Sequence, residues 1–484
     1  MNALLKIHVP DSCLIKTLNL AERRMRGKWG AIVTVNGRTA FNHAVRISAR
    51  TKAKRFEIYE RNAPLVMIPA GQTLITIDAL AKMRRVKLPT RGTLVSSKER
   101  NRKFKKQTGP GLPVVIYGNV GGYNSVCKVT SGLALALEEI GVSVCIRDSL
   151  NEMSPVEDRG EWERHQHLIA RAPDYPHAAI FQYHFKPRHN PKNIAWSARI
   201  DASDNFSTLE KKNVDERNSH DCMFTYSAHS KQVLENRGCE RVRVMPLGVD
   251  TSIFKPVTTA MDFPIPSSAR VLFQNFDGQT TGARFVFFIA GMMQARKGFP
   301  EVIHAFASTF HGRKDVLLWV HGRAEQWGED FTHEMRADMP PMLWTDGHVS
   351  DEVLNSMLNR ANCYLSPHRL EGFGLMPLQA MAAGTLCIVS DYAGPQDYAH
   401  NGNCLLLPVV ETACRNPLIA DGVVFGEWSS ANLSARMREV MRGGVKVQSL
   451  TAAGMDTAMA WPWLRAAQAI VSGIEASGHT VNRS

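Results

Sequence analysis

Apolar residues between positions 113 and 470 occur in short continuous runs that alternate with helix-spaced faces. Such runs are typical of strands buried on both faces of a parallel sheet. They cover residues 113–118, 142–146, 285–291, 361–367 and 385–390. Helical spacing covers residues 131–140, which Gly141 ends, residues 300–310, and the segment with Leu375, Leu378 and Ala382 at i, i+3 and i+7, which Gly384 ends. This succession of strand, helix and strand predicts an α/β chain with parallel sheets.

Residues 1–95 follow a different pattern, in which polar and apolar positions alternate between turn residues. Residues 30–39 contain the pair Asn36-Gly37, a strong hairpin signal. Residues 55–59 alternate, and residues 65–77 predict two strands around the turn Pro69-Ala-Gly71. We therefore expect a small β-rich domain of about three to five strands before the α/β part.

Charged residues and glycines stand where three of the predicted strands end. Glu371-Gly-Phe-Gly374 lies between a strand and the helix that begins near Leu375. A carboxylate beside open backbone N–H groups at a helix N-terminus can hold an anion next to a hydroxyl-bearing group. Arg296 and Lys297 follow the run 285–291, and Gly121-Gly122 follows the first run, where backbone can approach a ligand closely. This chemistry suits a sugar joined to a diphosphate.

These segments, together with residues 241–250, resemble in order the motifs of retaining nucleotide-sugar glycosyltransferases of GT-B fold, family 4 (glycosyl transferases group 1). The resemblance covers most of residues 113–408. In that family two glutamates stand eight positions apart. The first, which contacts the donor sugar, corresponds to Glu371, whereas Gln379 occupies the place of the second, which contacts the nucleotide ribose.

The family often has an arginine where this chain has Met292, while Lys297 keeps the position of a cation that holds the donor diphosphate. Arg296 is a candidate substitute for the missing arginine. The donor-binding residues implied by the resemblance are Gly291, Arg296, Lys297, Gly322, Gly372, Phe373, Gly374, Leu375 and Gln379. Gly121 and Gly122 form the implied glycine loop of the first half.

A second catalytic candidate beside Glu371 is His184, which ends the strand predicted over residues 178–184. The family often has a histidine near such a strand end, beside the sugar. The ordinary alternative is a histidine packed in a loop.

The resemblance implies an α/β GT-B fold, with two Rossmann-like domains facing a cleft and preceded by the small basic β-rich domain. The implied domains are residues 1–108 (β-rich, with linker), 109–255 (acceptor), 256–450 (nucleotide sugar) and 451–484 (a closing helix that packs back on the N-terminal half). It also implies a retaining transfer without a metal ion or other cofactor, from a nucleotide sugar that we expect to be a UDP-sugar such as UDP-glucose. Lys297 and the N–H groups near Gly372 would stabilise the departing diphosphate. The chain has no Asp-x-Asp motif of the kind that holds Mg²⁺ or Mn²⁺.

The charge is distributed very unevenly. Residues 1–106 hold 24 of the 58 Lys and Arg residues but only 6 of the 45 Asp and Glu residues, which is an excess of 18 positive charges. The other residues hold 34 basic and 39 acidic residues. A solvated surface is the ordinary explanation, but so local an excess favours a polyanion, and the strand pattern favours double-stranded DNA over anionic membrane. The candidate nucleic-acid contacts are Arg23, Arg24, Arg26, Lys28, Arg50, Lys52, Lys54, Arg55, Arg84, Arg85, Lys87, Arg102, Lys103, Lys105 and Lys106.

Three functions therefore stay open. The first is a glycosyltransferase that acts on a hydroxylated base in DNA, similar to phage enzymes that place sugars on modified pyrimidines. The second is the same catalyst acting on a glycan, a lipid or a protein, with the basic domain docked on a membrane or a partner. The third is a binding protein that has lost catalysis, since Met292 and Gln379 replace two expected polar contacts.

The cysteines and the length of the apolar runs indicate where in the cell the protein is expected. The nine cysteines are scattered without a C-x-x-C pair, which favours reduced thiols in a cytoplasm (that of the host for a phage protein) and argues against a structural zinc site. Cys363 and His368 lie close in sequence, and we interpret both as structural. We expect neither a signal peptide nor a membrane span, because the longest apolar run, residues 285–293, is too short. The oligomeric state is unknown from the sequence.

Overall fold

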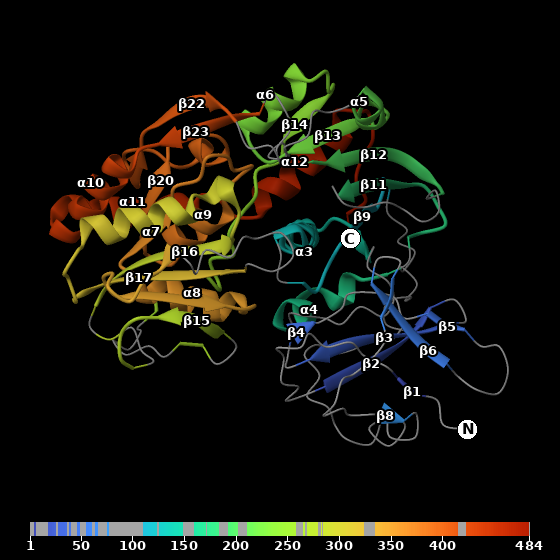
Figure 1. Cartoon of the computed structure of the whole chain (residues 1–484). Helices are drawn as coiled ribbons and strands as arrows, with labels where there is room; N and C mark the ends of the chain where they lie inside the picture. The colour runs from blue at the N-terminus through green and yellow to red at the C-terminus, as the bar shows by residue number, and fades with distance from the viewer. Residues whose placement is uncertain are drawn as a thin grey trace. The chain divides into compact units, whose positions relative to one another are not determined.

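The computed structural model of the chain divides into two compact units, Met1–Leu94 and Val95–Ser484 (Figure 1). The structure describes the strands β1–β8 of the first unit, and in the second it describes residues 110–122, 125–148, 159–170, 172–182, 192–201, 211–257, 265–266, 269–278, 282, 284–323, 334–414 and 423–483. Within these residues no helix is long and apolar enough to cross a membrane. The eight cysteines among them form no disulfide.

The first unit is β-rich, as predicted. Its described strands pair antiparallel as β2-β3-β4, β5-β6-β7 and β1-β8. They are β1 (Leu4–Leu5), β2 (Leu18–Met25), β3 (Lys28–Val35), β4 (Arg38–Thr39), β5 (Arg46–Ser48), β6 (Arg55–Glu60), β7 (Ala63–Leu65) and β8 (Ile75–Thr76). Val35 pairs with Arg38, the register that the predicted hairpin requires. The predicted number of strands is too low. In addition, β7 pairs with β6 and β8 pairs with β1, so these two strands do not form a hairpin around a shared turn. Pairing with other strands overrides the local turn signal here.

The first half of the second unit is a six-stranded parallel sheet in the order β10-β9-β11-β12-β13-β14. Its strands are β9 (Val114–Gly118), β10 (Val144–Asp148), β11 (His177–Gln182), β12 (Ile194–Ile200), β13 (Cys222–Thr225) and β14 (Val242–Val244). Its described helices are α3 (Ser125–Glu139), α4 (Arg159–His165), the 3-10 turn η1 (Gln166–Leu168), α5 (Lys211–Asn218) and α6 (Ala228–Asn236). Strands β9, β11 and β13 are buried throughout, as a parallel sheet covered on both faces requires.

Helix α3 begins at Ser125, earlier than the predicted start at Ser131. The β-branched residues Val129 and Thr130 lower the helix propensity of its first turns, but both are buried against the sheet. The Thr130 hydroxyl also donates to the Val126 carbonyl at 3.2 Å. Packing therefore decides the start of this helix, and α3 follows the glycine loop directly.

The second half is a seven-stranded sheet in the order β15-β18-β17-β16-β19-β20-β21, in which only β15 runs antiparallel to its neighbour. Its strands are β15 (Arg270–Gln274), β16 (Phe285–Met292), β17 (Val316–Arg323), β18 (Met342–Asp346), β19 (Cys363–Ser366), β20 (Leu386–Ser390) and β21 (Leu405–Leu407). Its other described elements are the 3-10 turns η2 (Ala295–Lys297) and η4 (Gly394–Asp397), the helices α7 (Phe299–Thr309), α8 (Asp351–Arg360), α9 (Leu375–Ala382) and α10 (Ser430–Arg442), and the hairpin β22 (Val409–Ala413) and β23 (Val424–Trp428).

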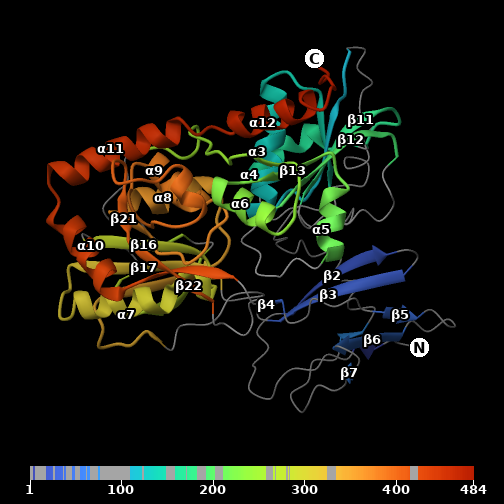
Figure 2. The same ribbon diagram turned by 90° about the horizontal axis from the view of Figure 1, so that it is seen from above.

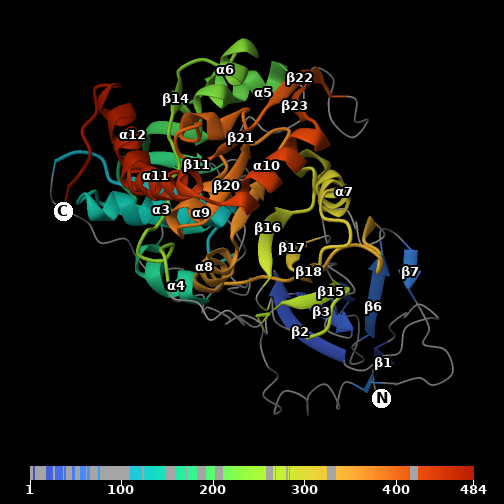
Figure 3. The ribbon, with the colours of Figure 1, turned by 90° about the vertical axis from the view of Figure 1, so that its left-hand side faces the viewer.

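Helices cover both faces of this second sheet (Figure 3). On one face Phe287 of β16 packs with Phe306 of α7 and Met437 of α10. On the opposite face Phe288 belongs to the same core as Leu358 of α8 and Met381 of α9. The apolar run 285–291 is continuous because alternate side chains fill two different cores.

The order of the strands places the loops that carry chemistry. In the second sheet the chain proceeds from β16 to β17 and β18 on one side, and from β19 to β20 and β21 on the other. Strands β16 and β19 are neighbours, so the topological switch point lies between them. Ligands of doubly wound sheets bind outside the carboxyl ends of strands at such a point, and the loops after β16 and β19 are those with Lys297 and Glu371.

The last helices return to the first half of the unit. Helix α11 (Val445–Met459) belongs to the second half, and α12 (Leu464–Glu475) lies beside α3 (Figure 2). Trp463 fills the space next to Gly132, where a Cβ atom would lie 2.4 Å from the indole. The Leu112 amide donates to the Thr480 carbonyl at 2.8 Å, so the end of the chain pairs with the start of the first sheet.

Candidate active site at the switch point of the second sheet

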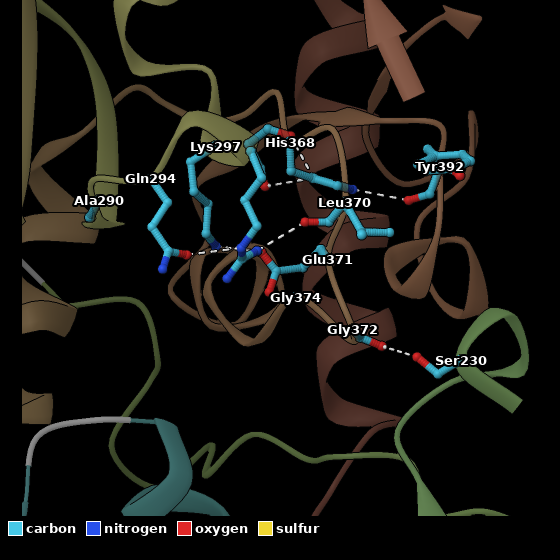
Figure 4. Close-up of polar contacts among 12 residues, drawn as sticks. Ser230, Ala290, Gln294, Lys297, His368, Leu370, Glu371, Gly372, Gly374 and Tyr392 are labelled. Atoms are coloured by element: carbon cyan, nitrogen blue, oxygen red, sulfur yellow. Dashed lines mark hydrogen bonds and ion pairs between the residues drawn. The ribbon is translucent and has the colours of Figure 1, made fainter. Parts of the chain in front are cut away.

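The structure brings Glu371 together with Lys297 (Figure 4) and with Arg296. Glu371 lies in the loop between β19 and α9, and the two cations lie in η2, which follows β16. The Glu371 Oε2 atom accepts a hydrogen bond from Arg296 Nη1 at 3.1 Å and another from the Lys297 ammonium. Residues some 75 positions apart in the chain therefore meet because their strands are neighbours.

The three charges are largely withdrawn from solvent. The side chains of Glu371, Arg296 and Lys297 are 15%, 13% and 21% exposed. Burial alone would raise the pKa of Glu371, but the positive charges of Lys297 and Arg296 outweigh it and hold the pKa well below its ordinary value. Glu371 is therefore an ionised hydrogen-bond acceptor at neutral pH, in a group of three residues with one net positive charge.

The loop after β19 is fastened to the loop after β16 by further bonds that sequence reasoning missed. The Arg369 amide donates to the Arg296 carbonyl at 2.7 Å, and Arg296 Nη1 donates to the Leu370 carbonyl at 2.9 Å. Gln294 accepts from Arg296 Nε at 3.0 Å. No local sequence signal marks these bonds, because each joins residues from the two loops or depends on the turn that η2 adopts.

The side chain of Arg369 extends this support to two other elements. It donates to Glu301 of α7 at 2.7 Å and to Glu427 of β23 at 2.8 Å. Trp428 donates to the Pro367 carbonyl at 2.7 Å and lies against Gly298, where a Cβ atom would be 2.8 Å from the ring. The N-terminus of α7 and the Glu371 loop are thus held as one assembly.

Gly374, one of the two predicted glycines beside Phe373, serves close packing. Gly374 is the N-cap of α9 with φ +86°, and a Cβ atom there would lie 2.8 Å from the Tyr398 hydroxyl, which donates to the Gly374 carbonyl. Phe373 itself is buried, with its ring 5.4 Å from Tyr398 and 5.7 Å from Trp461 between centroids. The Phe373 side chain therefore belongs to the core, so only its backbone is available for a donor.

The first turn of α9 supplies the backbone of the expected anion site. Gly374 has no side chain to cap this helix, and Leu375, its first residue, is half-buried. Gln379 lies one turn further along the same helix and is also half-buried. Unpaired N–H groups at a helix N-terminus carry partial positive charge, which adds to that of Lys297.

Gly291 and Gly322 are register partners at the carboxyl ends of β16 and β17. Gly291 has φ +136°, and nothing lies within 4 Å of a Cβ atom built there, whereas a Cβ at Gly322 would be 2.7 Å from the Gly291 carbonyl oxygen. Next to them Met292, at the position of the family's arginine, has 40% of its surface exposed. At this edge an apolar side chain therefore faces outward where the family has a cation.

The glycine loop of the first half lies at the corresponding switch point, between β9 and β11. Gly121 has φ +74° and Gly122 is buried. Gln182, the last residue of β11, accepts from the Asn119 amide at 3.2 Å and from the Thr130 hydroxyl at 2.6 Å. This loop lies in the opposite half from the Glu371 group.

His184 lies outside the described residues. Among the predicted nucleic-acid contacts, Arg23 and Arg24 lie in β2, Lys28 in β3 and Arg55 in β6, whose side chains are not described. The other members of that set lie outside the described residues: Arg26, Arg50, Lys52, Lys54, Arg84, Arg85, Lys87, Arg102, Lys103, Lys105 and Lys106.

His368 is buried next to this site, and Cys363 is buried at the start of β19. The two ring nitrogens of His368 each lie 3.0 Å from a carbonyl oxygen, that of Ser366 and that of Tyr392. Burial lowers the pKa of His368, and its ring joins the Glu371 loop to Tyr392. Among the described residues no group of three or more His, Cys, Asp or Glu side chains is placed to hold a metal ion.

Comparison with known proteins gives the family of the second half. Residues 273–448 match the family model "Glycosyl transferases group 1". Phosphatidyl-myo-inositol mannosyltransferase of Mycolicibacterium smegmatis is 27% identical over 207 residues, which are 43% of this chain and 48% of the relative. The chain thus spans about half the length of this curated relative.

Solved structures of low identity share the fold of the second unit. A glycosyltransferase from Rickettsia africae has a TM-score of 0.53 and 11% identity, covering 75% of this chain and 98% of that one. HepE of Anabaena in complex with UDP and glucose has a TM-score of 0.52 and 10% identity, covering 75% of this chain and 100% of that one. The predicted GT-B fold is thus confirmed, and the match of residues 273–448 to the group 1 model supports a glycosyltransferase.

Proposed function

We propose that the chain is a glycosyltransferase that moves a sugar from a nucleotide-diphosphate donor to a hydroxyl acceptor. The observation that carries this proposal is the Glu371 carboxylate held by Arg296 and Lys297 at the switch point of the group 1 domain. The mannosyltransferase name of the relative and the UDP and glucose bound to HepE support a sugar donor of this kind.

The chemistry follows from these charges. The bond between the anomeric carbon and the donor phosphate breaks, and the bond to the acceptor oxygen forms. Negative charge develops on the departing diphosphate, where Lys297 and the N–H groups at the start of α9 stabilise it. Glu371 orients the sugar by accepting bonds from its hydroxyl groups. The acceptor proton passes to the departing phosphate, which fits a retaining transfer without a protein nucleophile.

This arrangement is proposed to work without a metal ion, because Lys297 and the N–H groups at the start of α9 supply the positive charge that a divalent ion would supply. His184 is proposed as a second residue beside the sugar. Activity of the purified protein in EDTA tests the first point. Loss of turnover with chelator, followed by recovery with Mg²⁺ or Mn²⁺, would contradict metal independence.

For the acceptor we propose a hydroxylated base in double-stranded DNA. The excess of 18 positive charges in residues 1–106 supports this, because a domain that tracks phosphates can hold DNA beside the catalytic unit. Extrusion of a base from the stack costs a few kcal/mol, which phosphate contacts can offset. An anionic phospholipid is the second candidate, since the curated relative is named for phosphatidyl-myo-inositol.

The decisive experiment uses the whole protein and a panel of radiolabelled nucleotide sugars. Each donor is incubated with hydroxymethylated duplex DNA, with unmodified DNA, or with vesicles that contain phosphatidylinositol. Label in hydroxymethylated DNA alone supports the first acceptor, and label in lipid supports the second. Binding of nucleotide without transfer or donor hydrolysis would indicate the third candidate, a protein that retains the fold but not catalysis.

A further inference from the structure

The guanidinium of Arg296 is held on two sides by neutral groups as well as by Glu371. Its Nε atom donates to Gln294 Oε1 at 3.0 Å, and its Nη1 atom donates both to the Leu370 carbonyl at 2.9 Å and to Glu371 Oε2 at 3.1 Å (Figure 4). At 13% exposure its side chain is the most buried of the three charged groups. A planar guanidinium bonded at both its edges has one orientation.

Lys297 differs from Arg296 in ways that suit a different task. Its ammonium contacts the same Glu371 oxygen, but its side chain is more exposed, at 21%. An ammonium on a flexible stem is a point charge whose three donors rotate freely, so it can change partners with little rearrangement.

We infer that Gln294 is a positioning residue for the transfer reaction. It fixes the Arg296 guanidinium, and Arg296 in turn holds Glu371. Lys297 is the cation that exchanges between Glu371 and the donor diphosphate. This inference rests on the proposed function and adds a role for a residue outside the predicted donor site. The backbone of the same turn supports it, because Lys297 N donates to the Gln294 carbonyl at 2.8 Å and Arg369 N donates to the Arg296 carbonyl at 2.7 Å.

The division of tasks has an electrostatic reason. A buried carboxylate that loses all its cationic partners is strongly destabilised. If Lys297 moves to the diphosphate, Arg296 still compensates the charge of Glu371, provided that the guanidinium keeps its place. Gln294 and the Leu370 carbonyl hold it there, so the carboxylate stays aimed at the sugar while the ammonium moves.

The test compares substitutions at Gln294 in the full-length protein. Gln294→Met removes the acceptor oxygen with little change in volume, and Gln294→Glu keeps an acceptor oxygen. Gln274→Met is the matched control, because Gln274 is also half-buried and bonds loop carbonyls, those of Phe276 and Gly278, at the opposite edge of the sheet. Measurements are kcat and KM for the donor, and the Kd of UDP by calorimetry.

We expect Gln294→Met to lower kcat about tenfold, with KM for the donor and the Kd of UDP changed less than about twofold, since one hydrogen bond to a charged group is lost. Gln294→Glu should recover most of kcat, and Gln274→Met should match the wild type. Lys297→Ala should instead weaken UDP binding.

An unchanged kcat in Gln294→Met, with the wild type active, would overturn the inference and leave the proposed function standing. An equal loss of kcat and UDP affinity would also overturn it, because Gln294 would then act on the diphosphate. If Gln294→Met fails to fold, Gln294→Glu is the variant that tests the inference. A tenfold loss of kcat in Gln294→Glu would contradict the requirement for an acceptor oxygen at this position. Absence of turnover in the wild type with every donor would contradict the proposed function itself.

Discussion

At the scale of single residues, the site depends on one carboxylate that is kept charged in a buried place. Glu371 is 15% exposed, yet its two cationic neighbours keep its pKa low. A neutral residue there would remove the carboxylate that compensates the charges of Arg296 and Lys297 and would offer the donor sugar no charged acceptor. The same group of residues thus supports the fold of the two loops and the chemistry proposed for them.

We predict that Glu371→Gln lowers the transfer rate about 10²–10³-fold, because one charged hydrogen bond made to the reacting sugar is worth about 2.7–4 kcal/mol. The amide keeps the size of the side chain but leaves two buried cations without a compensating charge, so the melting temperature should fall as well. Initial rates and a melting curve on the same preparation check both points. Turnover near that of the wild type would remove Glu371 from the catalytic residues.

The sequence was informative at this scale where a residue type is tied to a local motif. Glu371, Lys297 and the glycines follow strand ends, and a strand end can be read from the apolar pattern. Gln294 and Arg369 could not be predicted, because what they do depends on two loops meeting across neighbouring strands. Arg369 has no local signature of partners 58 and 68 residues away, and Gln294 matters only because its neighbour Arg296 reaches Glu371, 75 residues away.

At the scale of elements, the strongly periodic segments were predicted well. The residues spaced at i, i+3 and i+7 form α9, and residues 300–310 nearly coincide with α7, because both helices bury one apolar face in a core. The start of α3 was predicted too late, since its first turns are stabilised by burial of Val129 and Thr130 rather than by propensity. The contacts between elements, which set how the two halves meet, were not predictable from the pattern.

One such contact joins α6 of the first half to the donor loop of the second. Asp397 Oδ2 accepts from the amide of Ala228, the first residue of α6, at 3.0 Å, and the Ser230 hydroxyl donates to the Gly372 carbonyl at 3.4 Å. Within the helix, Ser227 is the N-cap and accepts from the Ser230 amide. The N-terminus of α6 is therefore capped both from its own chain segment and from the other half.

This arrangement gives a prediction with an internal control. Asp397→Ala and Ser227→Ala should each cost about 1 kcal/mol of stability, the usual effect of losing a helix cap. Only Asp397→Ala should also reduce kcat/KM for the donor, because of these two variants only it removes a hydrogen bond between α6 and the second half. Denaturant unfolding and steady-state kinetics measure the two effects. If both variants lower kcat/KM equally, the contact between the halves has no separate role.

At the scale of the whole molecule, burial of histidines should make stability depend on pH. Burial lowers the pKa values of His177, His229, His321 and His368, and that of His321 falls to about 4. The unfolded chain binds protons at these positions near the ordinary histidine value of 6.5. Between that pH and about 4 the unfolded state therefore holds more protons, so the free energy of unfolding falls as pH falls.

We predict that the denaturant midpoint declines from pH 7 to pH 5, and that His321→Asn reduces the size of this decline. The amide can still bond the Thr345 hydroxyl, which lies 3.0 Å from His321 Nδ1, but it does not titrate. His311→Gln, at an exposed position, is the control and should leave the decline unchanged. A midpoint that rises as pH falls through this range would contradict the sign of the effect.

The division into two units allows the proposed acceptor to be tested on the molecule as a whole. All the family-like motifs lie after residue 112, whereas residues 1–106 hold the positive excess and the remainder is net negative. A protein that starts near Gly109 keeps Leu112, whose amide pairs with Thr480, and should retain UDP binding and slow donor hydrolysis. It should lose most affinity for duplex DNA.

The dependence of DNA affinity on salt tests the same point. For the full chain, the logarithm of the affinity for DNA should fall steeply with the logarithm of the salt concentration, because bound phosphates release counterions. This slope should be flatter for the shortened protein. Equal DNA binding and modification by both proteins would show that the basic unit is not the DNA module. Binding of the full chain to anionic vesicles but not to DNA would favour the phospholipid acceptor.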